Sequence, residues 1–377
     1  MIYVDANATT PLWPEALAAM EPFYREHFGN PSSAHAFGLQ LHGPLFKAQE
    51  AVAALLGAQD PVREMIFTSG GTESNCTAFH SALSARPERR HLLVSAVEHA
   101  SVLQVAQHYA RLGYRLDLLP VDAHGQLATE TLAQALRDDT VLVAVMHANN
   151  ETGAIFNIAE LCARAQARGA LCLVDAVQSA GKIPVQAQAW GVDYLSVSGH
   201  KFHGPKGVGA LYVRAGAPLI PLIHGGPQQM GRRAGTENVA GLVGMGVAAA
   251  LALRRMGEYR TLSQLRDHFE NALAAHVDVR VSSQKTARLP NTSHLCFKGV
   301  DNRILLKFLE RQKIYASAGA ACGKDASEPS HVVRAMGVAD DYARGAIRFS
   351  FMLGTLQSEV DALVAAVKEG ILENNDR

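Results

Sequence analysis

Short apolar runs alternate with longer amphipathic stretches between about residues 45 and 213 of the chain. The short runs are rich in Val, Leu and Ile and favour buried strands, whereas the longer stretches favour helices. Strands that alternate with helices in this way are typical of a mostly parallel sheet with helical crossovers. The seven expected strands cover residues 64–68, 91–96, 115–121, 141–146, 171–176, 194–198 and 209–214, and the expected helices include residues 72–85 and 158–168.

The pattern changes after the most apolar stretch of the chain, residues 239–253. This stretch is shorter than the roughly 20 residues that a membrane-spanning helix needs, so we expect a buried helix. A second set of helix and strand patterns follows from about Tyr259. We therefore predict an α/β fold with a large domain over residues 15–255 and a smaller α+β domain made of residues 1–14 and 256–377.

The charge of the chain is balanced, with 35 Lys and Arg residues against 35 Asp and Glu residues. A balanced chain has no general attraction for nucleic acid or an anionic membrane, so we predict neither as a partner. The five cysteines are odd in number and have the spacing of neither a zinc site nor a disulfide framework. We therefore predict no metal and a reducing, cytoplasmic location, and the first residues do not have the pattern of a signal peptide.

One lysine, Lys201, directly follows an apolar run that we expect to be a strand, in the segment DYLSVSGHKFHGPKG. Poor solvation at such a position lowers the pKa of a lysine and frees its amine to form a Schiff base. Lys206 is the competing candidate, but Pro205 and Gly207 flank it in an expected exposed turn. The sequence therefore favours Lys201 and indicates pyridoxal phosphate as the cofactor.

Other candidate residues come directly after expected strands, where ligands bind in parallel sheets. Gly71 belongs to a glycine pair that lets the backbone approach an anion closely, and Thr72 opens an expected helix whose free N–H groups suit a phosphate. An ordinary capped turn is the alternative. His99 is a candidate to stack on a flat ring and exchange protons, although a lone histidine is more often structural. Asn150 is a candidate donor to a phenolate or a carboxylate, although asparagine is also common in turns.

Asp175 ends an otherwise apolar strand, where a carboxylate is costly unless it meets a partner. The pyridinium nitrogen of pyridoxal phosphate is such a partner, and a helix-capping role is the alternative. Gln178 is placed to reach the phenolic oxygen of the same ring, and Ser198 and His200 are expected near the phosphate. We do not predict a metal site at His200 and His203, because no carboxylate or thiol lies near them in the sequence.

Cys322 differs from the other four cysteines because it lies in the Gly- and Ala-rich segment of residues 316–327, beside Lys324. Such surroundings favour exposure and a reactive thiolate, whereas cysteines in expected helices and strands usually behave as small apolar residues. An incidental loop cysteine is the alternative.

These motifs together resemble those of the cysteine desulfurases, class-V members of the aspartate aminotransferase superfamily with the type I fold of pyridoxal-phosphate enzymes. The resemblance runs nearly from end to end. The matching motifs are YVDANATTP, FGNPSSAHAFG, GGTESN, EHASV, NNETG, VDAVQSAG, SGHKFHGPKG, GRRAGTENVA, SEPSHVVRAMG and IRFS. The GRRAGTENVA block is most similar to the nitrogen-fixation branch, and Cys322 matches the persulfide-forming cysteine of the long-loop subgroup.

The resemblance implies roles for the residues around the ring of pyridoxal 5′-phosphate. Lys201 matches the lysine that joins the cofactor covalently, His99 the residue that stacks on the ring as an acid and base, and Asp175 the partner of the pyridinium nitrogen. Asn150 and Gln178 match residues that adjust the ring and the substrate.

The resemblance also implies roles around the phosphate and the substrate. Gly71 belongs to the matching GGTESN motif, and Thr72, Ser198 and His200 match phosphate-binding residues. Thr236 matches a residue that reaches the phosphate of a neighbouring subunit, which implies a homodimer. Arg348 matches the arginine that pairs with the carboxylate of the substrate, a task that suits a guanidinium group.

The function that the resemblance implies is conversion of L-cysteine to L-alanine, with the sulfur taken up by Cys322 as a persulfide and passed to an acceptor or cluster-scaffold protein. Two alternatives stay open: a selenocysteine lyase or aminotransferase on the same fold, and a non-catalytic sulfur carrier. The sequence also leaves open whether the sulfur serves iron–sulfur cluster assembly, tRNA thiolation or DNA phosphorothioation.

Overall fold

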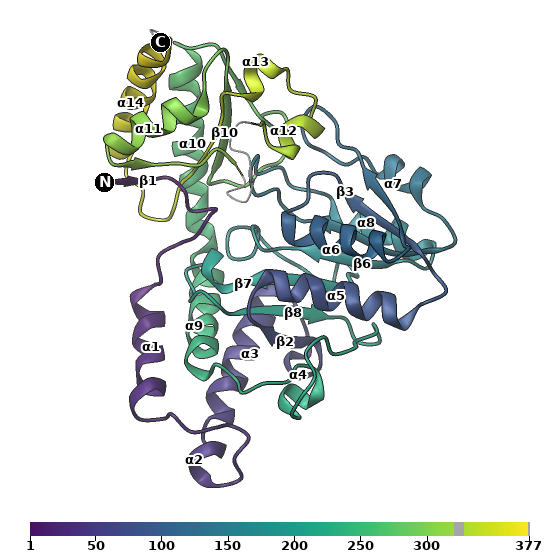
Figure 1. Ribbon diagram of the computed structural model, residues 1–377. Helices are drawn as coiled ribbons and strands as arrows, with labels where there is room; N and C mark the ends of the chain where they lie inside the picture. The colour runs from purple at the N-terminus through teal and green to yellow at the C-terminus, as the bar shows by residue number, and fades with distance from the viewer. Residues whose placement is uncertain (320–327, 376–377) are drawn as a thin grey trace.

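The largest sheet has seven strands, in the order β2-β8-β7-β6-β5-β3-β4 (Figure 1). We describe it from a computed structural model that covers residues 1–319 and 328–375. The strands are β2 (Met65–Thr68), β3 (His91–Ser95), β4 (Arg115–Leu119), β5 (Thr140–Met146), β6 (Leu171–Asp175), β7 (Tyr194–Ser198) and β8 (Gly209–Val213).

The pairing in this sheet is mixed but mostly parallel. Strand β8 runs antiparallel to both of its neighbours, β2 and β7, and the other pairs are parallel. The predicted seven-stranded, mostly parallel sheet is confirmed, and each predicted strand is found within two residues of its expected ends. Strand β4 ends at Leu119, before Pro120, because proline has no N–H to donate to a neighbouring strand.

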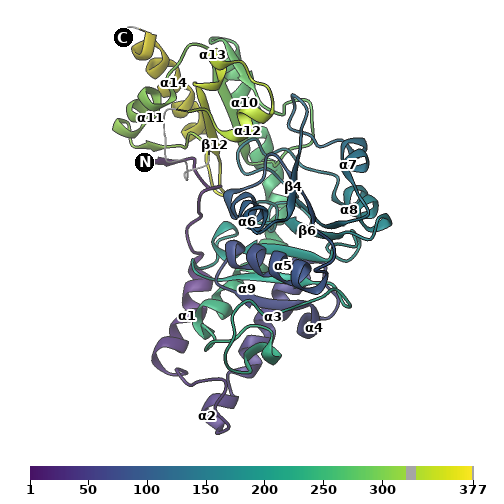
Figure 2. The ribbon, with the colours of Figure 1, turned by 45° about the vertical axis from the view of Figure 1, so that its right-hand side comes forward.

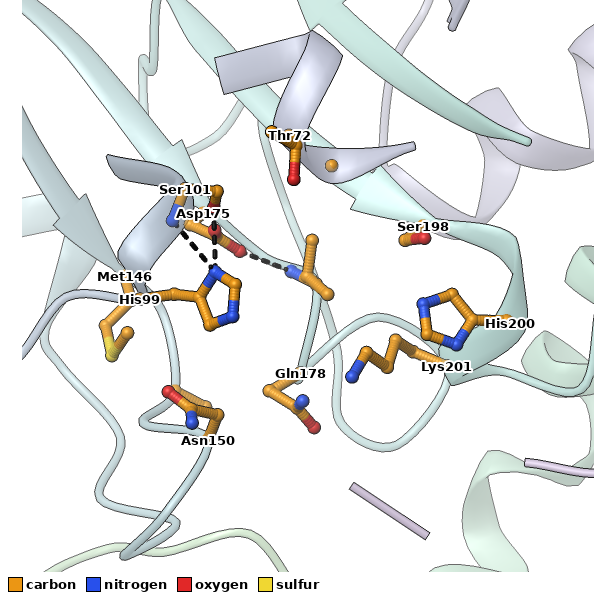
Figure 3. Close-up of a pocket in the computed structure, with 13 residues that line it drawn as sticks. Thr72, His99, Ser101, Met146, Asn150, Asp175, Gln178, Ser198, His200 and Lys201 are labelled. Atoms are coloured by element: carbon orange, nitrogen blue, oxygen red, sulfur yellow. Dashed lines mark hydrogen bonds between the residues drawn. The ribbon is translucent and has the colours of Figure 1, made fainter. Parts of the chain in front are cut away.

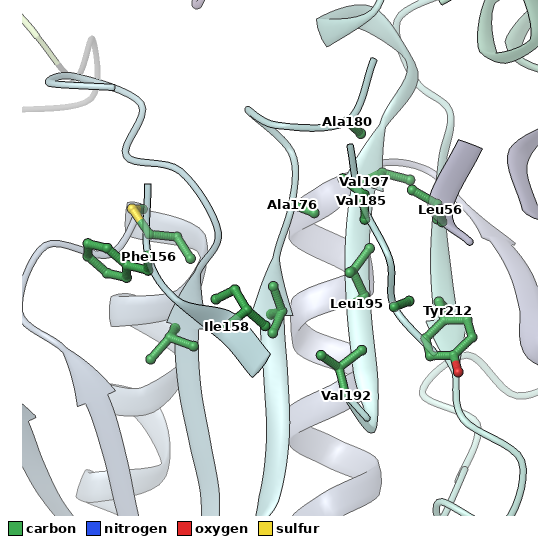
Figure 4. Packing of buried hydrophobic residues seen from close by; sticks show 14 of the residues in the cluster. Leu56, Phe156, Ile158, Ala176, Ala180, Val185, Val192, Leu195, Val197 and Tyr212 are labelled. Carbon is green, nitrogen blue, oxygen red and sulfur yellow. The ribbon is translucent and has the colours of Figure 1, made fainter. Parts of the chain in front are cut away.

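Helices cover both faces of the sheet, so that the sheet separates two apolar layers. Helices α5 and α6 lie on one face, and α3, α8 and α9 lie on the other. Neighbouring residues of one strand point to opposite layers: Met65 and Phe67 belong to one apolar cluster and Ile66 to the other. Figure 4 shows part of the first cluster, between the sheet and the helix that carries Leu56.

The helices and 3₁₀ turns of this part of the chain include the predicted connectors. They are α1 (Pro14–Arg25), α2 (Ala36–Leu39), α3 (His42–Leu56), α4 (Pro61–Glu64), α5 (Gly71–Ala85), α6 (Ala100–Arg111), α7 (Thr129–Ala135), α8 (Ile158–Ala167), η1 (Gly199–Lys201), η2 (Gln228–Gly231) and α9 (Val239–Arg255).

Helix α9 is the most apolar segment of the chain, as the sequence indicates. By length and composition alone, the continuous helical stretch Val239–Ala274 is sufficient to cross a membrane. However, α9 packs against both α1 and α3, and buried residues occur along its length, from Val239 to Ala252. We therefore assign α9 to the interior of the fold.

A second, smaller sheet is antiparallel, with the order β12-β10-β9 (Figure 2). Helices α10, α11 and α14 pack on it around their own apolar cluster. This part of the fold contains η3 (Met256–Glu258), α10 (Tyr259–Ala274), β9 (Val279–Val281), β10 (Thr292–Phe297), α11 (Asn302–Arg311), β11 (Ile314–Tyr315), α12 (His331–Ala335), α13 (Asp340–Ala343), β12 (Ala346–Ser350) and α14 (Gln357–Asn375). The domain bounds at residues 14 and 255 stay a prediction.

The N-terminal segment connects the two sheets. Strand β1 (Ile2–Tyr3) pairs in parallel with β11 beside the small sheet, and the chain then runs to α1 beside the large one (Figure 1). On the way, Thr10 donates from its backbone N–H and its hydroxyl to the carbonyl of His200, at 3.1 and 2.9 Å. The first residues of the chain are therefore held next to the end of β7.

Candidate active site

A cavity of about 260 Å³ opens at the carboxyl ends of the strands of the large sheet (Figure 3). Separate segments that follow β2, β3, β5, β6 and β7 converge there, as expected for a parallel sheet. The residues that line the cavity are Gly71, Thr72, His99, Ser101, Met146, Ala148, Asn150, Asp175, Val177, Gln178, Ser198, His200 and Lys201.

All residues predicted to bind the cofactor line this cavity, except Thr236. Thr236 is exposed, in the segment between η2 and α9. Arg348 is buried beside the cavity, where it contacts Asn150. Cys322 lies outside the described residues. The structure thus brings the predicted residues together, while the role of each stays a prediction.

Asp175 ends β6 and is held by hydrogen bonds to both carboxylate oxygens. Asn75 donates from Nδ2 to Oδ2 at 3.0 Å, and the backbone N–H of Val177 donates to Oδ1 at 2.9 Å. Asn75 lies in α5, one turn after Thr72, and we did not single it out from the sequence. The signal that was available is its position as a polar residue on the buried side of an expected helix.

His99 precedes the first residue of α6, where its ring caps the helix. Its Nδ1 accepts a hydrogen bond from the backbone N–H of Ser101 at 3.1 Å. Burial lowers the pKa of His99; the Asp175 carboxylate opposes this effect and the charge of Lys201 adds to it. Because Nδ1 is an acceptor, the neutral ring carries its hydrogen on Nε2. His99 therefore offers a donor at Nε2.

Lys201 lies in the 3₁₀ turn η1, directly after β7, on the side of the cavity opposite His99 (Figure 3). Its Nζ donates to the backbone carbonyls of Asn7 at 2.6 Å and Ala8 at 2.9 Å. The N-terminal segment thus supplies acceptors that hold the amine near the cavity, a contact that no local sequence pattern indicates.

The upper part of the cavity in Figure 3 has groups that suit an anion. Helix α5 begins there with Gly71 and Thr72, and Ser198 and His200 complete this side. A side chain at Gly71 has no room, because its Cβ would lie 2.7 Å from Cγ2 of Val177. Burial lowers the pKa of His200 to about 4, so its ring is neutral at neutral pH and can donate a hydrogen bond.

Arg348 comes from β12 of the small sheet and is almost completely buried. One terminal nitrogen donates to Oδ1 of Asp5 at 2.7 Å, and the other donates to the backbone carbonyl of Asn150 at 2.9 Å. Within the described part of the chain its Nε makes no hydrogen bond. The guanidinium group is therefore held in one orientation beside the cavity.

The chain has relatives among known proteins over nearly its whole length. The profile of the family described as aminotransferase class-V matches residues 2–363. A cysteine desulfurase of Trichormus azollae is 45% identical over 371 residues, which cover 98% of this chain and 92% of that protein. A solved structure named as a NifS-like protein is 36% identical with a TM-score of 0.92, and the match covers 99% of each chain. A structure of SspA in complex with cysteine is 32% identical with a TM-score of 0.82, and covers 93% of this chain and 99% of that one.

Proposed function

The chain belongs to the class-V aminotransferase family and is a cysteine desulfurase, and we propose that its cavity binds pyridoxal 5′-phosphate and that Cys322 receives the sulfur of L-cysteine as a persulfide. The family implies dependence on this cofactor. The observation that carries the proposal is the convergence of an amine, a carboxylate, an imidazole and a helix N-terminus on one cavity, each at or shortly after the end of a strand.

The residues around the cavity fit the cofactor in their chemistry. Lys201 would hold the aldehyde carbon through its amine, and Asp175, with its oxygens fixed by two donors, would pair with the ring nitrogen. His99 would lie on a face of the ring, and Gln178 would meet the phenolic oxygen. The phosphate would be held by the N-terminus of α5 and by Thr72, Ser198 and His200.

When bound, the cofactor supplies an electron-withdrawing ring that accepts the negative charge that develops at Cα of the amino acid. The chain itself positions the substrate and moves the proton. Arg348 binds the carboxylate, and the amine of Lys201 removes the proton from Cα. His99 donates from Nε2, and Asp175 holds the ring nitrogen in its protonated form.

Sulfur transfer is the second part of the proposed reaction. The thiolate of Cys322 attacks the sulfur of the substrate, so that an S–S bond forms while the Cβ–S bond of the substrate breaks. The bonding electron pair stays with Cβ of the substrate, which then takes up a proton. The amine of Lys201 would return the proton to Cα, and the product leaves as L-alanine. The outer sulfur of the Cys322 persulfide passes to an acceptor or cluster-scaffold protein, for iron–sulfur cluster assembly or another thiolation pathway, and we propose the cytoplasm as the location.

Product analysis tests this function directly. The purified protein with pyridoxal 5′-phosphate is expected to release one alanine for each sulfur taken from L-cysteine, without a keto acid as a second substrate. A requirement for a keto acid would favour an aminotransferase instead. A protein that shows no visible absorbance change when L-cysteine is added would contradict the proposed site.

Arg348 is the residue proposed to bind the carboxylate of the substrate. Replacing it by lysine keeps a positive charge opposite Asp5 but removes the planar guanidinium group, so the substrate carboxylate loses its proposed partner. We expect KM for L-cysteine to rise and kcat/KM to fall by about 10–100-fold. Arg303→Lys, at an exposed ion pair in α11, is the matched control. An unchanged KM in the Arg348→Lys protein would refute the role of Arg348.

We also propose a homodimer, in which Thr236 reaches the phosphate site of the partner. The supporting observation is a group of large apolar side chains that α1, α2, α3, the loop between α1 and α2 and the segment before η2 leave exposed. They are Leu17, Tyr24, Phe28, Phe37, Leu39, Phe46, Leu222 and Ile223. Large apolar side chains that stay exposed in a single chain are frequent at protein interfaces.

The dimer prediction is tested at Phe28 and Phe37. Their rings contact edge to face at 5.1 Å between centroids, and Phe28 is 69% exposed. A Phe28→Asp/Phe37→Asp double variant is expected to sediment as a monomer of 40.4 kDa, whereas the parent is expected at about twice this mass. A Leu372→Asp variant, at an exposed position of α14, is the control. A monomeric parent would contradict the proposal.

A further inference from the structure

Lys182 is a buried lysine, only 2% exposed, that the proposed reaction does not use. It lies in the turn after β6, one helical turn beyond Gln178. Its Nζ donates to Oδ1 of Asn7 at 2.9 Å and to Oε1 of Gln178 at 3.0 Å. Burial of a lysine amine is costly, so a fold that keeps one close to a reactive cavity indicates a task for it there.

The contact with Lys182 fixes the orientation of the Gln178 side chain. A lysine amine in such contacts is a donor, so the oxygen of the Gln178 amide must face it and the nitrogen must point elsewhere. That nitrogen donates one hydrogen to the backbone carbonyl of Asn7 at 2.9 Å and has a second hydrogen to give. Gln178 lines the cavity between Asn150 and Lys201 (Figure 3). The amide nitrogen of Gln178 can therefore donate a hydrogen bond to a ligand in the cavity.

The other partner of Lys182, Asn7, is itself held on every side. Its Oδ1 accepts from Lys182 and from Asn291 at 3.2 Å, and its Nδ2 donates to Thr292 at 2.9 Å and to the carbonyl of Asn150 at 3.2 Å. Donors surround the oxygen and acceptors surround the nitrogen, so the amide has one orientation. The Asn7 amide that accepts from Lys182 is thus fixed by its other hydrogen bonds, and it holds the Lys182 amine in place.

The charge state of Lys182 agrees with this arrangement. Burial lowers its pKa well below the usual value, and the positive charges of Lys201 and Arg348 add to the effect. A neutral amine has two N–H groups, and the two acceptors, on Asn7 and Gln178, match them. In either protonation state, the groups that face Lys182 receive hydrogen bonds from it.

We propose that Lys182 is a positioning residue for the desulfurase reaction, which holds the oxygen of Gln178 and so keeps the amide nitrogen available to the bound cofactor. The inference rests on the proposed function, in which Gln178 donates to the phenolic oxygen of pyridoxal 5′-phosphate. A donor stabilises negative charge on that oxygen. It therefore lowers the pH midpoint at which the visible absorbance band of the bound cofactor titrates.

The test uses the cofactor-loaded protein with Lys182→Met, which keeps most of the apolar side chain but cannot donate. We expect the midpoint of the visible band to rise by about 0.5–1 pH unit, the size of one lost hydrogen bond. We expect kcat for L-cysteine to fall by about 3–10-fold, with little change in KM. Lys298→Met, at an exposed lysine of the small sheet, is the matched control and should titrate like the parent.

The same substitution in a Gln178→Ala protein distinguishes an effect that Lys182 exerts through Gln178 from a simple loss of positive charge. In a Gln178→Ala protein, Lys182→Met should add no further shift, because the side chain through which Lys182 acts is gone. A charge effect would persist in that background and would overturn the proposal, as would an unshifted midpoint in Lys182→Met itself. Should the methionine variant fail to fold, Lys182→Gln gives the same test with a smaller expected shift, since its amide donates from a shorter side chain. A parent that forms no visible band at all would refute the proposed function instead.

Discussion

A Lys201→Ala variant is expected to lose turnover of L-cysteine by about 1,000-fold or more and to form no stable visible band with pyridoxal 5′-phosphate. Two separate tasks are lost with this one amine: the covalent hold on the cofactor and the removal of the Cα proton. The position of the amine supports both, because η1 places it at the end of β7 and the carbonyls of Asn7 and Ala8 hold it beside the cavity.

The competing lysine makes a sharp control for this prediction. Lys206 lies five residues further on and is exposed, so its side chain stays in solvent. A Lys206→Ala protein should keep the visible band. Borohydride reduction of the parent, followed by peptide mapping, should find the pyridoxyl group at position 201. Finding it at position 206, or at no lysine, would overturn the proposed site.

The sequence predicts the large sheet well because its signal is local. Strands such as β5 and β6 are continuous apolar runs with both faces buried, as expected in the centre of a parallel sheet. Residues directly after such strands must lie at one edge, so a list of strand ends is already a list of candidate site residues. The antiparallel direction of β8 escaped prediction, because the apolar pattern of a strand has no direction.

The supporting contacts of the site escaped prediction for a different reason. Asn7 and Lys182 are 175 positions apart, and Asp5 and Arg348 are 343 positions apart. Neither Asn7 nor Asp5 stands at the end of an expected strand, and the turn that carries Lys182 reads as an ordinary connection. Asn7 and Asp5 reach the cavity only because the N-terminal segment runs between the two sheets. The pattern of apolar and polar residues does not indicate where such a segment lies.

Three of the cysteines outside the segment of residues 316–327 differ from a reactive thiol in their pKa values. Burial raises the pKa of Cys76 and raises that of Cys296 to about 11. The hydrogen bond with the Cys162 thiol, together with burial, raises the pKa of Cys172 well above its usual value. Thiols with raised pKa values are poor nucleophiles at neutral pH because the thiolate is the reactive form. Cys76, Cys172 and Cys296 are therefore weak candidates for the sulfur acceptor, and Cys322 stays the candidate that the sequence favours.

The ends of the segment that carries Cys322 lie next to the cavity. Gly319 lies against the carboxylate of Glu151, since a Cβ on Gly319 would be 2.7 Å from its Oε2, and Ser330 donates to the same oxygen at 2.6 Å. Glu151 directly follows Asn150, which lines the cavity.

A Cys322→Ser variant is accordingly expected to keep the visible band and its change on addition of L-cysteine, but to release alanine at least about 100-fold more slowly. Serine retains the size of the side chain and removes the nucleophile, so binding survives and sulfur transfer stops. Mass spectrometry of the parent after brief exposure to L-cysteine should find one added sulfur on the peptide that contains position 322. The Cys76→Ser protein is the control and should show the same added sulfur on that peptide. Normal alanine release by the Cys322→Ser protein would show that the sulfur leaves without this thiol, and the persulfide mechanism would then be wrong even if Lys201 binds the cofactor as proposed.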